Sequence, residues 1–216
     1  MRKAVLLLAL AVGQAAGAGS VTGRVQVVDK AGKAAADLGD TVVWVDDVKT
    51  KPRPTRATIT MQGKAFVPKV TVVPVGSTVD FPNQDPILHN VFSVSGENRF
   101  DLDLYKRPKS GSVTFQVAGL VRVYCNIHPQ MSAIVMVRDN PFFAKAGPDG
   151  GFRIEGVPAG RHVLKAWHER GGESSTEVVV PGEGEVSAEL RLDASTWKRA
   201  PHKNKFGKDY STGEKY

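Results

Sequence analysis

The 216-residue sequence contains a single cysteine, Cys125. One cysteine cannot form an internal disulfide bond, and it cannot hold an iron–sulfur cluster, which needs several thiolates. In an oxidising compartment a free thiol is at risk of oxidation or of pairing with another chain. A metal thiolate would remove that hazard, so the lone cysteine is itself an indication of a metal site.

Long apolar runs are missing from the sequence after its N-terminal region. Residues 1–18 combine a short basic start, an apolar run and a small-residue end, which is typical of a secretory signal peptide. We expect cleavage before Gly19; an uncleaved N-terminal anchor is the alternative. No cysteine directly follows the segment, so a lipid anchor is not expected, and no later stretch is apolar enough to span a membrane. The sequence therefore predicts a periplasmic or otherwise exported protein.

A strong charge of one sign is also lacking. The formal net charge is +7, and removal of Arg2 and Lys3 with the signal peptide leaves +5 (7 − 2). The sequence has no basic helix and no motif of alternating aromatic and basic residues. A nucleic-acid partner is therefore not expected.

No convincing helical period occurs in the sequence. Its 22 glycines, 13 prolines and short valine-rich runs predict an all-β fold. Residues 20–29 read as a first strand and residues 41–45 as a second. A connector rich in proline and lysine, residues 49–56, precedes the segment that carries the candidate chemistry.

That segment is residues 121–131, V-R-V-Y-C-N-I-H-P-Q-M. Its alternating part predicts a strand that ends at Cys125, and the following loop offers His128 and Met131. A thiolate, an imidazole and a thioether within seven positions suit copper in both oxidation states. His89, 36 positions upstream (125 − 89), can supply a second imidazole.

Each of these residues also has a plainer interpretation. A lone cysteine at a strand end is most often a small buried apolar residue, and Met131 can be part of a core. Zinc is the competing metal, because cysteine and histidine bind it equally well. Structural zinc sites favour paired cysteines or histidines in short loops and do not recruit methionine, so the spacing favours copper.

His89-Asn90 followed by C-x-x-H-x-x-M at Cys125 resembles the cupredoxins, the group of plastocyanin, pseudoazurin and amicyanin. The resemblance covers about residues 57–138. It implies one type 1 copper per chain, with His89, Cys125 and His128 as equatorial ligands and Met131 as a weak axial ligand. Asn90 would hydrogen-bond across to the cysteine loop. It further implies an electron carrier that serves a protein redox partner, with His128 as the exit for the electron inside an apolar rim of Pro86, Ile127 and Pro129.

Residues 148–168, P-D-G-G-F-R-I-E-G-V-P-A-G-R-H-V-L-K-A-W-H, resemble the carboxypeptidase regulatory-like domain, a transthyretin-type β-sandwich. A looser version of that family's opening lies at residues 23–45. We therefore expect a β-sandwich made of residues 20–50 and 140–194, interrupted by the cupredoxin domain at 57–138. Three consecutive independent segments are the alternative. A 30-residue N-terminal piece could hardly bury a core alone, which favours the interrupted arrangement.

Residues 195–216 form a basic C-terminal tail in which lysines alternate with isolated aromatic residues. Two interpretations stay open. The tail is either solvated, or it is an extended arm that lies over a sandwich or docks an acidic partner.

An enzymatic function is not expected. Multicopper oxidases require an H-C-H run, whereas Cys125 is flanked by Tyr124 and Asn126, and none of the five histidines forms H-x-H. Reductases of the nitrite reductase type need a second copper with three more histidines. The alternative to electron carriage is a non-redox binding module, or a copper-handling protein of the cell envelope.

Overall fold

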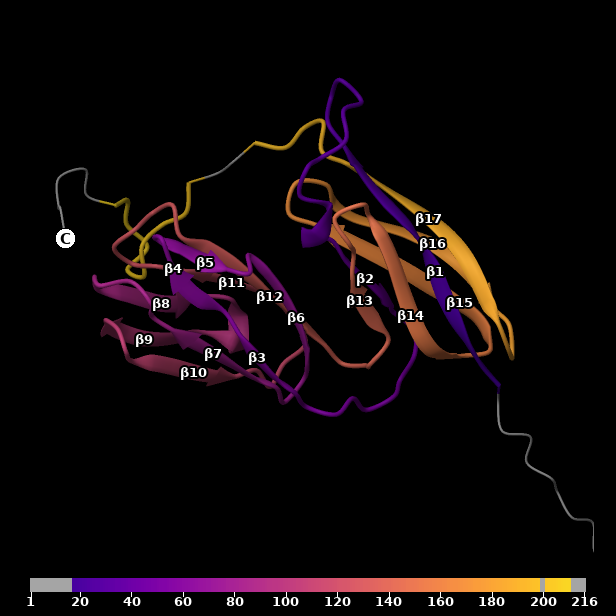
Figure 1. Cartoon of the computed structure of the whole chain (residues 1–216), viewed down its shortest axis with the longest axis horizontal. Helices are drawn as coiled ribbons and strands as arrows, with labels where there is room; N and C mark the ends of the chain where they lie inside the picture. The colour runs from indigo at the N-terminus through magenta and orange to yellow at the C-terminus, as the bar shows by residue number, and fades with distance from the viewer. Residues whose placement is uncertain (1–16, 199–200, 211–216) are drawn as a thin grey trace, which may run out of the picture.

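The computed structural model describes residues 17–198 and 201–210. These residues form seventeen β-strands and two short 3-10 helices, η1 (Leu38–Asp40) and η2 (Gly96–Asn98). The all-β prediction is confirmed. Figure 1 shows the strands gathered into two lobes that lie side by side.

The lobe that contains the first and the last strands is called the outer lobe. It consists of two sheets that face one another across a core of valine, leucine, isoleucine and phenylalanine side chains. The first sheet has the order β14 (Gly151–Pro158), β1 (Ala18–Val28), β17 (Glu185–Asp193), and the second the order β13 (Phe143–Lys145), β2 (Val42–Val45), β15 (Gly160–His168), β16 (Gly172–Val180).

The other lobe, called the inserted lobe, is built from the strands between β2 and β13. Its core contains Cys125 and Met131 together with valines and phenylalanines. Its sheets are β10 (Ser110–Thr114), β7 (Thr78–Pro82), β3 (Arg56–Thr58); β6 (Val70–Pro74), β12 (Ser132–Arg138), β11 (Gly119–Tyr124), β8 (His89–Ser93), β9 (Phe100–Tyr105); and the hairpin β4 (Thr60–Gln62), β5 (Ala65–Val67).

The outer lobe is assembled from both sides of the insertion. Strand β1 pairs in antiparallel fashion with β14 and in parallel with β17, and β2 pairs with β13 and β15. Neither sheet can therefore close until the chain has passed through the inserted lobe. We propose that the two lobes are separate domains, the outer one interrupted by the inserted one.

The two lobes meet along strands β2 and β12, which are buried on both faces. In β2, Val43 and Val45 point into the outer core, while Val42 and Trp44 belong to a cluster between the lobes. Strand β12 contributes Ile134 and Met136 to that cluster from the other side. Because successive strand residues face opposite ways, a continuous apolar run serves two cores at once. The junction is therefore a third apolar core.

Polar contacts cross the same junction. The Lys145 ammonium group donates to the Val70 carbonyl oxygen at 2.7 Å, and Lys69 Nζ lies 2.5 Å from Glu169 Oε2. Each contact joins a residue of the outer lobe to one of the inserted lobe. They tie together the backbone and side chains around the apolar cluster.

The predicted signal peptide lies outside the described residues except for Gly17 and Ala18. The Gly17 carbonyl oxygen accepts a hydrogen bond from the Ala159 amide at 2.9 Å, and Ala18 begins β1. Cleavage before Gly19 would therefore remove one residue of that strand. Among the described residues, no helix has the length and apolar character that a membrane span requires.

Candidate metal centre

The candidate ligands come from neighbouring strands of one sheet. His89 is the first residue of β8, and Cys125 follows the last residue of β11. Tyr124 pairs with Phe92, so the two strands run in opposite directions side by side. This pairing brings the start of β8 and the end of β11 to the same edge of the inserted lobe.

The loop between β11 and β12 is closed by its own backbone. The Cys125 amide lies 3.3 Å from the Met131 carbonyl oxygen, and the Met131 amide donates to the His128 carbonyl oxygen at 3.0 Å. The Cys125 and Met131 side chains are fully buried in the core of the inserted lobe. His128 lies between them and is 8% exposed.

Three donor atoms converge at this edge. His89, Cys125 and His128 each offer one ligand atom, and these atoms lie within 4.8 Å of one another. His89 Nδ1 is 3.1 Å from His128 Nδ1, which is 3.6 Å from Cys125 Sγ. In the part of the chain that the structure describes, this is the one group of three or more such side chains. A sulfur and two imidazole nitrogens facing one buried point fit copper or zinc.

The outward nitrogen of His89 is held by a carboxylate. Asp85 Oδ2 lies 2.8 Å from His89 Nε2, and Asp85 also accepts the backbone N–H groups of Gly63 and Lys64. Burial alone would raise the pKa of Asp85, but the hydrogen bonds from Lys64, His89 and Gly63 outweigh it and hold that pKa below its ordinary value. An ionised Asp85 favours a proton on Nε2, which leaves Nδ1 of His89 free to bind a metal.

Burial is the main cause of the pKa shifts of the other two donors, Cys125 and His128. Burial raises the pKa of the Cys125 thiol, opposed in part by the backbone N–H groups of Asn90, Ile127 and His128. The backbone N–H group of Asn90 donates to Cys125 Sγ at 3.4 Å. Burial also lowers the pKa of His128. The imidazole is thus kept neutral, as ligation requires, while the thiol must release its proton when a metal binds.

Asn90 links the two ligand segments. Its side-chain oxygen accepts the Asn126 amide at 3.3 Å, which ties β8 to the cysteine loop. Its amide group donates to Asp101 Oδ1 at 2.7 Å and to the Asp103 carbonyl oxygen at 3.0 Å. Asn90 is therefore fixed on both sides.

The surface above the site is partly apolar. Pro86 and Pro129 are exposed and Ile127 is partly exposed, while Leu88, next to His89, is 42% exposed. The role of His128 as an electron exit stays a prediction.

Several polar residues around the site had no assigned role in the sequence. Asp85 lies four positions before His89, a spacing that offered a signal. Asp101 lies in β9, and no sequence pattern marks it as a site residue. His202 and Tyr210 in the C-terminal tail reach the cysteine loop, and no periodicity points to them. Contacts between residues 73 to 85 positions apart depend on the tertiary fold alone.

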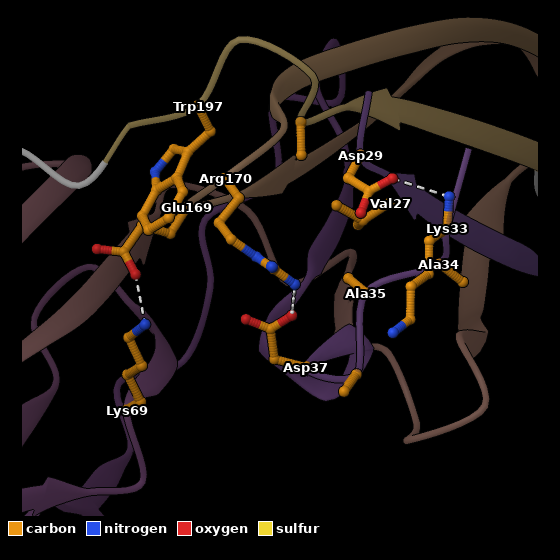
Figure 2. A pocket seen from close by; sticks show the side chains of 12 residues that line it. Val27, Asp29, Lys33, Ala34, Ala35, Asp37, Lys69, Glu169, Arg170 and Trp197 are labelled. Atoms are coloured by element: carbon orange, nitrogen blue, oxygen red, sulfur yellow. Dashed lines mark hydrogen bonds and ion pairs between the residues drawn. The ribbon is translucent and has the colours of Figure 1, made fainter. Parts of the chain in front are cut away.

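A separate hollow of about 580 Å³ lies at the junction of the lobes (Figure 2). None of the three donor residues lines it. Its charged side chains are largely paired with each other, because Arg170 contacts Asp37 and Lys69 contacts Glu169. The ion pairs in the hollow therefore have a structural role, and the hollow is separate from the metal centre.

No family model matches this chain, and no curated protein does. Among solved structures, the copper-containing nitrite reductase of Thermus scotoductus SA-01 is 29% identical over 42% of this chain, with a TM-score of 0.37. The match spans 24% of that reductase. A Cu(I) amicyanin variant is 27% identical over 38% of this chain and 82% of its own, with a TM-score of 0.36. A purple cupredoxin from Nitrosopumilus maritimus is 23% identical over 38% of this chain and 99% of its own, with a TM-score of 0.35.

Proposed function

We propose that this protein is an exported type 1 copper protein that carries single electrons between redox partners. The observation that carries the proposal is the convergence of Cys125 Sγ with ring nitrogens of His89 and His128 within 4.8 Å, in a buried pocket. A cysteine and two histidines are the trigonal donor set of blue copper. Met131, buried in the same core, is the proposed axial ligand.

Copper in such a site supplies a one-electron couple, Cu(II)/Cu(I). The protein contributes a frame that changes little between the two states. Asp85 orients His89, and Asn90 ties the two ligand segments together. Two backbone hydrogen bonds close the loop from Cys125 to Met131. Ligands held this way need little rearrangement when an electron arrives, and the activation barrier to electron transfer is therefore low.

The placement of His128 supports a protein partner. It is the most exposed of the three converging donors at 8%, and exposed Pro129 follows it. An electron could therefore pass through its ring to a protein docked on this edge. The predicted signal peptide supports export to the periplasm or beyond. One such group in the described residues supports one copper per chain.

A catalytic role has less support. A reductase with a second copper would need another histidine cluster, and the group at His89 is the one cluster of this kind within residues 17–198 and 201–210. His162 and His168 lie in β15 of the outer lobe and contact Asp47 and Asp37 instead. The alternative function is a copper-handling or binding protein of the envelope that does not cycle its metal.

The visible absorption spectrum of the protein with Cu(II) tests the proposal. We expect an intense thiolate-to-copper band that is absent in Cys125→Ser, and a reversible one-electron wave in voltammetry. Tight zinc binding without a blue copper form would contradict the copper assignment. A blue form that cannot be reduced and reoxidised would favour the copper-handling alternative.

A further inference from the structure

The C-terminal tail crosses from the outer lobe to the metal centre. After β17 the chain passes Trp197, and residues 201–210 lie against the inserted lobe near β8 and β11 (Figure 1). Trp197 lines the same junctional hollow as Lys69 of the inserted lobe and Glu169 of the outer lobe (Figure 2). The start of the C-terminal tail, at Trp197, therefore lies at the junction of the two lobes. Residues 201–210 are called the arm.

The arm hydrogen-bonds the backbone of the candidate metal loop. The Tyr210 hydroxyl group donates to the Cys125 carbonyl oxygen at 2.9 Å. His202 Nε2 lies 2.8 Å from the Pro129 carbonyl oxygen, which can only accept, so Nε2 carries a proton and donates. Two loop carbonyl groups, one on a proposed ligand and one next to His128, therefore end on arm side chains.

Aromatic contacts support these hydrogen bonds. The His202 ring stacks on Tyr124, the residue before Cys125, with ring centroids 4.0 Å apart and an interplanar angle of 21°. The Tyr210 and His202 rings meet edge to face, with centroids 5.2 Å apart and an interplanar angle of 87°. The two ring contacts fix the direction of both hydrogen bonds.

Lys205 engages the polar network behind the ligands. Its backbone amide donates to Asn126 Oδ1 at 2.9 Å, and its ammonium group lies 2.5 Å from Asp101 Oδ2. Asp101 in turn accepts from Asn90, which holds the loop through the Asn126 amide. The arm thus reaches the loop directly and also through Asn90.

We propose that the arm clamps the metal loop, with Tyr210 and His202 as positioning residues that hold residues 125–131 in the ligating conformation before metal arrives. The proposal rests on the proposed function, since it assigns a role toward that site. A loop fixed in advance loses less conformational freedom on binding, so metal is held more tightly. An arm that instead served to dock an acidic partner would leave the loop unaffected when its contacts are removed.

One substitution in the full chain and one truncation test the clamp. Tyr210→Phe keeps the ring but removes the hydroxyl group, which contacts the Cys125 carbonyl oxygen at 2.9 Å and His202 Nδ1 at 3.1 Å. Only the first of these contacts reaches the loop. A chain ending at Lys198 removes the whole arm. Lys208→Ala is the matched control, since Lys208 is exposed and its side chain has no hydrogen bond or ion pair in the described structure. The readouts are deuterium uptake by the amides of Cys125 and Met131 in the metal-free protein and the rate of copper loss to a chelator.

We expect Tyr210→Phe to speed both processes about five-fold, the equivalent of about 1 kcal/mol for one hydrogen bond. Removal of the arm should speed them more, and Lys208→Ala should match the unmodified protein. Unchanged uptake in both test variants would overturn the clamp, whatever metal binds. If uptake rises as expected but no blue copper form appears, the clamp stands and the proposed function fails.

Discussion

Each lobe contains a fully buried histidine beside an aspartate, and the two differ in what their second nitrogen meets. In the inserted lobe, His89 Nε2 is 2.8 Å from Asp85, and Nδ1 faces His128. In the outer lobe, His168 Nε2 is 3.6 Å from Asp37, while Nδ1 accepts the Arg170 amide at 3.2 Å. Only His89 keeps a nitrogen turned toward other ligands.

The difference shows that burial and a carboxylate neighbour do not define a metal ligand. In His168 the Nδ1 lone pair accepts the Arg170 amide, so Nε2 carries the proton of a neutral ring, and it has no hydrogen-bond partner among the described residues. Neither nitrogen then offers a lone pair to a metal, which makes His168 a structural residue. His89 is directed by Asp85 into the space that Cys125 shares. The orientation of the second nitrogen decides the role.

Replacing each histidine by alanine should separate the two roles most strongly. We expect His89→Ala to weaken copper binding by more than about 100-fold and to abolish the blue band, because an equatorial ligand is lost. His168→Ala should leave the band in place and lower the free energy of unfolding by about 2 kcal/mol or more, because it leaves a cavity. A copper titration and denaturant unfolding measure the two effects. The comparison breaks down if His168→Ala also removes the band.

Copper loading should protect one lobe more than the other. A ligand at about 1,000 times its dissociation constant stabilises the state that binds it by about 4 kcal/mol. We expect amides of β8 and β12 to gain protection from hydrogen exchange, and amides of β16 and β17 to change little. Equal protection in both lobes would show that they unfold as one unit and would contradict separate domains.

Asp85 and Asp37 offer a finer comparison. Asp85→Asn keeps the shape of the side chain but removes the charge that favours the Nε2–H form of His89. We expect copper affinity to fall about 10- to 100-fold, as for other residues that orient a ligating histidine. Asp37→Asn, made beside His168, should not change copper affinity. A competition titration with a chelator measures both, and equal losses in the two variants would remove the role assigned to Asp85.

A smaller effect concerns pH. Burial lowers the pKa of His168 from its ordinary 6.5, although Asp37 and Asp40 oppose the shift and Arg170 adds to it. As pH falls through about 6.5, His168 takes up a proton in the unfolded chain but stays neutral in the folded chain. The free energy of unfolding is therefore highest above that pH and decreases as pH drops through it. We expect the metal-free protein to lose less stability between about pH 7.5 and 5 in His168→Gln than in the unmodified protein. Denaturant unfolding at both pH values gives the slopes, and identical slopes would contradict a neutral buried His168.

The sequence contained enough to find the candidate ligands. Cys125, His128 and Met131 lie within one loop, so their spacing is itself a structural constraint. His89 was located by its asparagine neighbour and its distance along the chain. Asp85 was missed because an aspartate in a loop before a strand is ordinarily a turn residue.

The junction and the arm were harder to predict. Val42 and Trp44 lie in an apolar run that predicts a strand, but which faces it buries depends on the partner lobe. His202 and Tyr210 lie in a lysine-rich segment whose composition equally suits a solvated tail. Their contacts depend on where the loop lies in space, and local sequence does not encode that position.

The position of the arm at the end of the chain means that the proposed ligands are synthesised before the residues that hold their loop. Met131 completes the proposed ligand set, but Tyr210 emerges from the ribosome 79 residues later (210 − 131). At about 5 to 20 residues per second, that interval is about 4 to 16 s. During this window a nascent chain has every proposed ligand and lacks the hydrogen bond that Tyr210 gives to Cys125. Metal captured early would thus meet a looser loop than metal captured by the finished protein.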